Sequence, residues 1–196
     1  IAGFREDPGR HAGLLAQPRR MIIQPTPLAG AYTVALERRE DERGFFARAF
    51  CRDEFTAAGI EPDLSQANLS YNRLKGTLRG LHYQVPPYRE TKLVRCVAGS
   101  LFDVIVDVRP ESPTYREWFG VELSAANQLA VFVPRGFAHG LVTLQDDTSV
   151  FYMASEFYAP DSEAGLRWDD PRIGIDWPIE PTVISEKDRA WPDHVG

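Results

Sequence analysis

The feature that most constrains this fold is the even spread of glycine and proline along the chain. Fifteen glycines and fifteen prolines are scattered over 196 residues and divide the sequence into short segments. Several of these segments are rich in β-branched and aromatic residues, whereas signals for long helices are sparse. Many short strands at close spacing favour an antiparallel barrel or a jelly roll. The sequence therefore predicts an all-β domain whose strands enclose a cavity.

The clearest pair of strands lies in "KLVRCVAGSLFDVIVDVRP", residues 92–110. Two β-rich runs flank Gly99, and the alternation in the second run puts Asp103 on its polar side. This pattern predicts a β-hairpin that turns at "AGS". Residues 116–144 and 147–160 show the same strand-like character. A short helix within residues 51–60, ending at Gly59, and a turn at residues 112–118 are expected at the periphery.

Length, charge and cysteine content exclude several classes of protein. A chain of 196 residues, 43% hydrophobic, has the size of one domain. The net charge of −6 argues against a nucleic-acid binder, and no apolar run approaches the roughly 18 residues of a membrane span. Two cysteines, Cys51 and Cys96, are too few for a disulfide scaffold and indicate reduced thiols in the cytoplasm. We expect residues 1–20 to be an N-terminal appendage without the features of a secretory signal, and residues 21–196 to form a single domain.

Six motifs occur in order between about residues 23 and 192: "RGFFAR", "GTLRGLHYQ", "KLVRCVAGSLFDVIVDVRPESPTY", "PRGFAHG", "WDDP" and "SEKD". Together they resemble the dTDP-4-dehydrorhamnose 3,5-epimerase family. One such motif would be weak evidence, but six in order are specific. The resemblance implies a cupin-type jelly-roll barrel with short peripheral helices, usually a homodimer. It also implies action on a nucleotide-linked 4-keto-6-deoxyhexose with no metal and no cofactor.

The chemistry of this reaction defines the catalytic groups that it needs. Inverting a carbon next to a ketone requires a base, an acid on the other face of the sugar ring, and a cation where enolate charge develops. The resemblance implies that His82 is the base, Tyr152 the acid and Lys92 the cation. Asp188 would hold the other nitrogen of the histidine and fix its tautomer. Asp103 would be a further carboxylate in the pocket.

The nucleotide end of the substrate needs guanidinium groups and other donors for its diphosphate. The resemblance implies that arginine and histidine side chains contact the phosphates, that amide side chains lie near the base and phosphates, and that an aromatic ring stacks on thymine. In this order the residues are Arg43, Arg79 and His139; Gln66 and Asn68; and Tyr158. Glu163 and Lys187 match family positions less closely. One departure from the family pattern is Arg48, which stands where the family often carries a glutamate. The nucleotide preference is therefore open.

Arg79 and His82 raise a question of strand geometry. Residues three apart in a regular strand face opposite sides, but the resemblance implies that both lie in the pocket. Gly80 between them is a natural place for a β-bulge, which would shift the register by one residue and bring both side chains inward.

Alternative functions remain open at this point. A metal-dependent cupin would need an H-x-H pair and an acidic ligand, but this chain has His82 with Gln84, and Lys92 at the acidic position. His82, Glu90 and His139 are the ligand set that such an enzyme could still use. A jelly roll that binds sugar nucleotides without catalysis is a second alternative. Within the family, inversion at C3 alone or C5 alone, for an antibiotic or surface-polysaccharide sugar, is a third.

Overall fold

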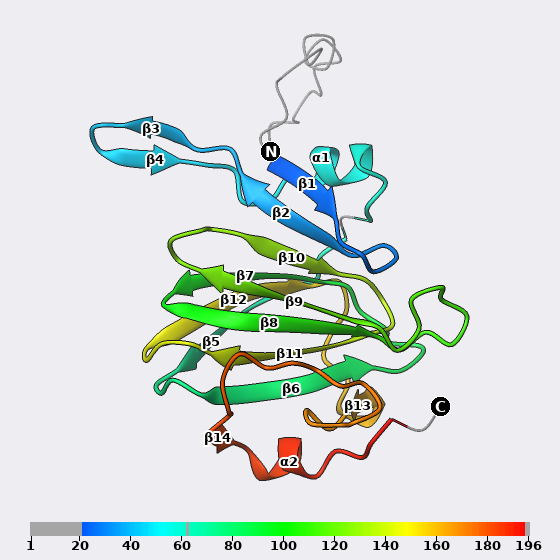
Figure 1. Cartoon of the computed structure of the whole chain (residues 1–196). Helices are drawn as coiled ribbons and strands as arrows, with labels where there is room; N and C mark the ends of the chain where they lie inside the picture. Colours follow the sequence, from blue (N-terminus) through cyan, green and yellow to red (C-terminus); the bar gives the residue numbers. More distant parts are fainter. Residues whose placement is uncertain (1–20, 62, 195–196) are drawn as a thin grey trace, which may run out of the picture.

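Strands dominate the computed structural model, which describes residues 21–61 and 63–194 (Figure 1). Six of them form a first sheet in the order β1 (Met21–Pro25), β2 (Tyr32–Leu36), β10 (Ala130–Val133), β7 (Lys92–Ala98), β12 (Thr148–Ala154) and β5 (Gln66–Asn72). A second sheet has the order β13 (Glu163–Gly165), β6 (Thr77–Gln84), β11 (Phe137–Thr143), β8 (Ser100–Asp107) and β9 (Trp118–Ser124), with β14 (Val183–Ile184) beside β6. β14 runs parallel to β6, and the other ladders are antiparallel.

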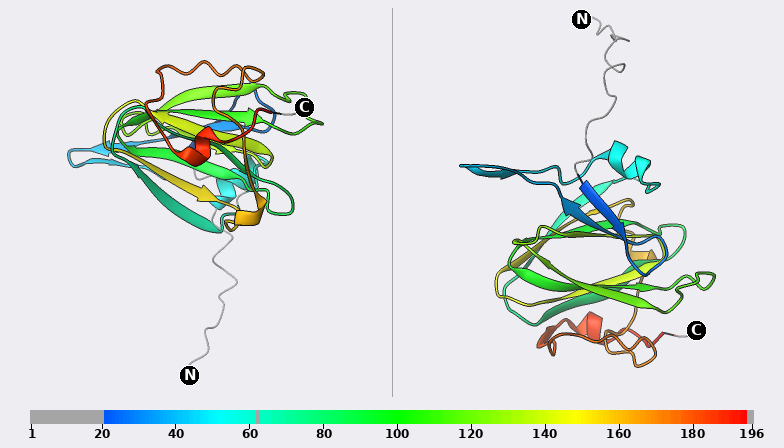
Figure 2. Two further views of the ribbon diagram at one scale, coloured as in Figure 1. Left: turned by 90° about the horizontal axis from the view of Figure 1, so that it is seen from below. Right: turned by 45° about the horizontal axis from the view of Figure 1, so that its top comes forward.

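The two sheets face each other, and the main core fills the space between them (Figures 1 and 2). Side chains of both sheets meet in this core, among them Val94 and Val131 from the first sheet and Leu101, Ile105 and Leu123 from the second. Hydrogen-bonded ladders among the described residues stay within each sheet, so the two do not close into one barrel. The predicted all-β jelly roll is confirmed, as two facing sheets.

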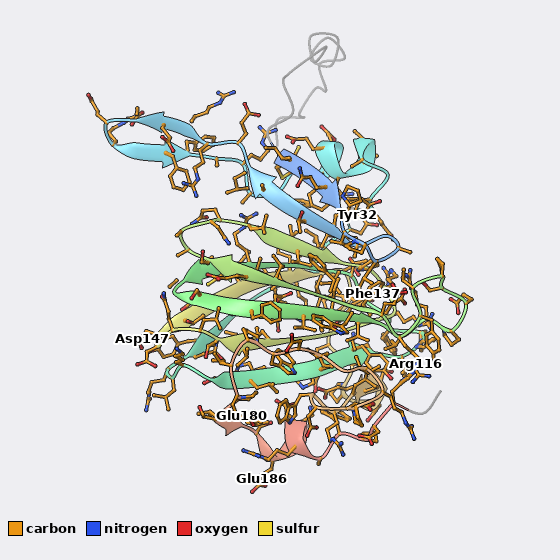
Figure 3. All side chains as sticks on the ribbon, in the orientation of Figure 1. Tyr32, Arg116, Phe137, Asp147, Glu180 and Glu186 are labelled. Carbon is orange, nitrogen blue, oxygen red and sulfur yellow. The ribbon has the colours of Figure 1, made fainter. Side chains whose placement is uncertain are left out.

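The second sheet is also covered on its outer face. Leu81, Val104 and Val106 pack there against Leu166 and Ile173 of the C-terminal segment. That segment includes α2 (Glu186–Arg189) and crosses the outer side of β6, where Glu180 and Glu186 are labelled in Figure 3. Burial on both faces explains why neighbouring residues of β8, such as Val104, Ile105 and Val106, are all apolar and all buried.

The peripheral elements are few and short. The helix α1 (Arg52–Ala57) is followed by Gly59 with a φ of +74°, which confirms the predicted helix. A one-turn 3₁₀ helix, η1, spans Pro160–Ser162. The hairpin of β3 (Arg39–Asp41) and β4 (Gly44–Phe46) projects from the body of the molecule (Figures 1 and 2).

The predicted hairpin at Gly99 is wrong. The strands β7 and β8 on either side of Gly99 belong to different sheets: β7 pairs with β10 and β12, and β8 pairs with β9 and β11. Gly99, with a φ of +71°, forms a corner at which the chain crosses from the first sheet to the second. A glycine turn between two strand-like runs indicates that the chain changes direction. The local sequence does not specify which strand each run pairs with, so it cannot distinguish a hairpin from a corner between two sheets.

The appendage expected at residues 1–20 lies outside the described residues. In the part of the chain that the structure describes, each helix is too short or too polar to cross a bilayer.

Candidate active site

A cavity of about 400 Å³ opens between the two sheets and continues into a smaller one of about 190 Å³. His82, Lys92 and Tyr152 line both, so the two cavities form one site. Nine of the thirteen residues expected in the site line these cavities: Gln66, Asn68, Arg79, His82, Lys92, His139, Tyr152, Tyr158 and Glu163.

His82 is held by a carboxylate behind it. Its Nε2 lies 2.5 Å from Oδ1 of Asp188, whose side chain is only 6% exposed. Two local features place Asp188 there. Val183 of β14 pairs with Thr77 of β6, and the Ser185 hydroxyl caps α2 by accepting a hydrogen bond from the Asp188 N–H.

Asp188 is set up to remain ionised and to orient the ring. Burial raises its pKa, but the hydrogen bond and charge of His82, with hydrogen bonds from Ser185 and the Gly80 backbone, outweigh burial and bring the pKa below its usual value. An ionised carboxylate can only accept a hydrogen bond, so in the contact between His82 and Asp188 the hydrogen is on Nε2 of His82. Nδ1 is then the ring nitrogen with a free lone pair, as a base requires.

The predicted bulge in β6 is confirmed. His82 pairs with His139 across β11, and Arg79 pairs with Leu141, so two residues of β6 stand opposite the single Gly140. Gly80 has a φ of +127°, and a Cβ there would lie 2.5 Å from the Cα of Gly140. Glycine is therefore required at this position, and the bulge turns both Arg79 and His82 to the cavity.

A second histidine–carboxylate pair lies beside the first. His139 Nε2 is 2.8 Å from Oδ2 of Asp103, which is 1% exposed. Asp103 was expected in the pocket itself, but it lies behind His139 and holds its ring, as Asp188 holds His82. The alternation of β8 correctly indicated a polar inward position, but it could not show that a neighbouring strand places an imidazole between that carboxylate and the cavity.

Lys92 and Tyr152 lie on the first sheet, opposite His82. Their strands are neighbours, with Tyr152 paired to Val94 and Ala154 paired to Lys92. Burial raises the pKa of Tyr152, the charge of Glu90 raises it further, and Arg79 acts in the opposite direction. The phenol is therefore protonated at neutral pH, as a proton donor must be.

Glu90 is a cavity residue whose position the resemblance did not indicate. Its Oε1 is 3.1 Å from Nζ of Lys92, and both side chains are 13% exposed. Glu90 precedes β7, which begins at Lys92, and the sequence suggested it only as a ligand for the metal-dependent alternative. The other residues that line the cavities without having been expected are Ser70, Tyr83, Gln84, Leu141, Val150 and Ala154.

The outer end of the cavity holds a network around Glu163. Its Oε2 accepts hydrogen bonds from the Tyr158 hydroxyl at 2.7 Å and from Nζ of Lys187 at 2.6 Å. Burial raises the pKa of Glu163, and these two hydrogen bonds lower it below its usual value. The Tyr158 N–H also donates to Gln66 Oε1 at 2.9 Å, which fixes the loop that carries the exposed tyrosine ring.

Two basic residues of the N-terminal region lie away from the cavity in this chain. Arg43 is at the tip of the β3–β4 hairpin, 84% exposed, and pairs with Asp41 at 2.6 Å. Arg48 lies 3.3 Å from Glu54 of α1. The structure therefore does not bring Arg43 to the other expected substrate contacts.

The ligand set of the metal-dependent alternative is not assembled. Glu90 is engaged by Lys92, and the residues that the structure describes contain no group of three or more His, Cys, Asp or Glu side chains spaced to hold a metal ion. An ammonium beside a divalent cation would also be repelled. The site therefore fits proton transfer between two facing sheets better than metal chemistry.

Comparison with known proteins gives a consistent result. The sequence model described as dTDP-4-dehydrorhamnose 3,5-epimerase matches residues 25–194. An epimerase of that name from Methanothermobacter thermautotrophicus is 46% identical over 169 residues, which cover 85% of this chain and 90% of that protein. A protein from Streptomyces niveus named dTDP-4-dehydrorhamnose 3-epimerase is 36% identical, over 86% of this chain and 82% of that one.

Solved structures show the same fold. The epimerase of Bacillus anthracis, with TDP and pyrophosphate bound, superposes with a TM-score of 0.86 at 38% identity and covers 89% of this chain and 99% of that one. The enzyme of Legionella pneumophila, in complex with dTDP-4-keto-L-rhamnose, gives a TM-score of 0.83 at 38% identity, over 88% of this chain and 92% of that one.

Proposed function

Because the chain belongs to the dTDP-4-dehydrorhamnose 3,5-epimerase family, we propose that it converts dTDP-4-dehydro-6-deoxyglucose to dTDP-4-dehydrorhamnose by inverting C3 and C5. The family members that are 43–46% identical to this chain are named as 3,5-epimerases, whereas the 3-epimerase of Streptomyces niveus is 36% identical. This difference favours inversion at both carbons over inversion at one.

The observation that carries the proposal is the position of a base and an acid on opposite sheets. His82 comes from β6 in the second sheet and Tyr152 from β12 in the first, and both line the same cavities. A sugar ring between them would present one face to an imidazole and the other to a phenol. Inversion needs this arrangement, because the proton leaves from one face and returns to the other.

The steps follow from the geometry. Nδ1 of His82 takes the proton from a carbon next to the C4 ketone, and the C–H electron pair moves into an enolate whose charge collects on the C4 oxygen. The Lys92 ammonium stabilises that oxygen. Tyr152 then protonates the same carbon from the opposite face, and solvent restores the phenol while His82 gives up its proton. No change of oxidation state occurs, so the balance needs no further reactant.

We assign the nucleotide end to residues of both cavities, with Arg79 and His139 in the smaller one and Gln66, Asn68 and Tyr158 in the larger one. Arg79 and His139 supply charge and hydrogen for the diphosphate, and Tyr158, Gln66 and Asn68 are available to the thymine and the adjoining phosphates. Glu163 and Lys187 hold Tyr158 in place through the hydrogen bonds given above. Competition between dTDP and UDP for the purified protein would measure the nucleotide preference that Arg48 leaves open.

We further propose a homodimer in which the β3–β4 hairpin reaches the cavity of the partner. The hairpin projects from the body of the chain (Figure 2) and carries Phe45 and Phe46, which are 47% and 65% exposed. β1 is an edge strand of the first sheet, available for pairing. This assembly would account for Arg43, which does not line the cavities of its own chain. The free thiols Cys51 and Cys96 support a cytoplasmic location.

Proton NMR of the reaction in D₂O tests the proposed function. With dTDP-4-keto-6-deoxyglucose as substrate, we expect deuterium at both C3 and C5 and the L-sugar as product, and the activity should survive exhaustive treatment with EDTA. Deuterium at a single carbon would establish a monoepimerase. Activity that is lost on chelation and restored by a divalent metal would contradict the proposed mechanism.

A further inference from the structure

The C-terminal segment brings a tryptophan, Trp191, against the proposed base. Its ring centroid lies 6.2 Å from that of His82 at an interplanar angle of 65°, an edge-to-face contact. This contact is on the side of His82 formed by β13, because Gly165 of β13 pairs with His82 across the β13–β6 ladder. The imidazole is therefore bordered by Asp188 at Nε2 and by the indole at its side.

Gly165 makes room for the indole. A Cβ at residue 165 would lie 2.4 Å from Cδ2 and Cε2 of Trp191 and 2.7 Å from its Nε1, distances that real contacts do not reach. The indole thus lies directly on the backbone of Gly165. Nε1 is buried there and has no hydrogen-bond partner among the described residues. The ring is held in this position by packing and by the Lys187 ammonium, whose Nζ lies 5.8 Å from the ring centroid, and not by its own hydrogen bond.

The chain directly after Trp191 is fixed by contacts with the rest of the molecule. The Pro192 carbonyl accepts a hydrogen bond from the Arg167 N–H at 3.0 Å, and Asp193 pairs with Arg167 at 3.1 Å. His194 is 9% exposed and contacts the Tyr115 hydroxyl at 2.7 Å. The segment therefore holds the indole against His82 through contacts that lie outside the cavity.

We infer that Trp191 is a positioning residue for His82. The inference rests on the function proposed above, in which His82 is the base. Among the described residues His82 has a hydrogen-bond partner on Nε2 alone, so the bond to Asp188 restrains Nε2 but not the tilt of the ring plane. The edge contact with Trp191 limits this tilt and fixes the direction of Nδ1. Small displacements of a reacting group are costly, on the order of 10²-fold for about 1 Å.

The central variant is Trp191→Ala, with Trp191→Phe as the conservative one. Trp191→Ala should lower kcat by roughly 10-fold, since the ring regains part of its freedom, and should change KM by less than about 3-fold, since Trp191 lines neither cavity. Trp191→Phe retains an aromatic edge and removes an N–H that has no partner, so kcat should return to within about 3-fold of wild type.

Trp177 provides a matched control. Like Trp191 it is partly buried on the C-terminal segment, and it packs edge-to-face on Phe102 at 6.3 Å, away from both cavities. Trp177→Ala should lower the melting temperature about as much as Trp191→Ala but leave kcat unchanged. A loss of kcat in Trp177→Ala equal to that in Trp191→Ala would show a general effect of destabilisation and overturn the inference.

Gly165→Ala tests the same contact from the other side and serves also if Trp191→Ala does not fold. The added methyl should displace the indole and lower kcat, whereas in a Trp191→Ala background it should cause little further loss, because the ring is already absent. Fully additive losses, or kcat within 2-fold of wild type in both single variants, would contradict the inference. If wild-type protein itself shows no exchange in D₂O, the proposed function fails instead, so the two failures are distinguishable.

Discussion

At the scale of single residues, the site depends on paired groups in which a buried partner defines the state of the one that faces the cavity. Asp188 does this for His82, and Asp103 does it for His139. Burying such a pair costs desolvation free energy, and leaving one member buried without the other costs more. Substitution of Asp103 or Asp188 should therefore be more damaging than substitution of a carboxylate on the surface.

Lys92→Ala should lower inversion and deuterium uptake in parallel. The ammonium acts on the enolate that both processes pass through, so its loss raises the barrier common to both. Losses on the order of 10²–10³-fold are expected from the removal of one group that stabilises an oxyanion. NMR time courses in D₂O measure both quantities in one sample. Exchange at the wild-type rate with inversion abolished would contradict this role for Lys92.

The family resemblance, and not residue types and spacing, indicated the nine expected residues that line the cavities; strand geometry added one point. Parity showed that Arg79 and His82 could share a side only through a bulge at Gly80, and that bulge exists. The place of Asp103 behind His139 and the contact of Trp191 with His82 were not predictable, because each depends on strands or segments that are distant in sequence.

At the scale of elements, the corner after β8 is fixed by one buried carboxylate. Asp107, whose side chain is 0% exposed, accepts hydrogen bonds from the Arg109 guanidinium at 2.6 and 2.8 Å, from Ser112 at 2.5 Å and from Thr114 at 2.7 Å. Arg109 also donates to the Ala29 carbonyl at 2.8 Å and so ties this corner to the turn after β1. The strand-like runs and the alternation in β8 were predictable, but the assignment of β7 and β8 to different sheets was not.

Asp107→Asn should lower the free energy of unfolding by about 3 kcal/mol at neutral pH, since it leaves the Arg109 charge partly buried without its counter-ion. Burial raises the pKa of Asp107, but its hydrogen bonds outweigh burial and lower the pKa below its usual value. The stabilisation is therefore present above the unfolded pKa of about 4 and is lost as the pH falls through the folded pKa.

Urea unfolding at several pH values measures the effect of Asp107→Asn. The difference from wild type should shrink on acidification. Asp169→Asn is the control, because the Arg167–Asp169 pair is 37% and 49% exposed and such pairs contribute at most about 1 kcal/mol. A difference for Asp107→Asn that is as small as in the control, or that grows as the pH falls, would contradict the account.

At the scale of the whole molecule, the exposed hairpin and its Arg43 are the feature that a single chain does not explain. A homodimer in which each hairpin completes the partner's site would explain both. The sequence suggested a dimer through resemblance alone, because an exposed strand edge in one chain does not identify its partner.

Subunit mixing tests this arrangement. Arg43→Ala and His82→Ala should each reduce activity as homodimers. In a mixed dimer, one site has the intact His82 of one chain and the intact Arg43 of the other, and the second site carries both substitutions. Mixing should therefore restore activity toward about half that of wild type per dimer, by the geometry of isologous dimers. Mixing His82→Ala with Tyr152→Phe is the control and should restore nothing, because both groups belong to the same cavity. Equal results from the two mixtures, or a monomer by light scattering, would contradict the proposal.

The central claim is that the base and the acid act from opposite sheets, and comparing His82→Ala with Tyr152→Phe in D₂O tests it most directly. His82→Ala should lose both deuterium uptake and inversion by roughly 10²–10⁴-fold, because proton abstraction itself is removed. Tyr152→Phe leaves His82 able to remove a proton and return deuterium to the same face, so labelled but uninverted sugar should accumulate. Inversion by Tyr152→Phe at the wild-type rate would contradict the assignment of Tyr152 as the acid on the opposite side of the sugar.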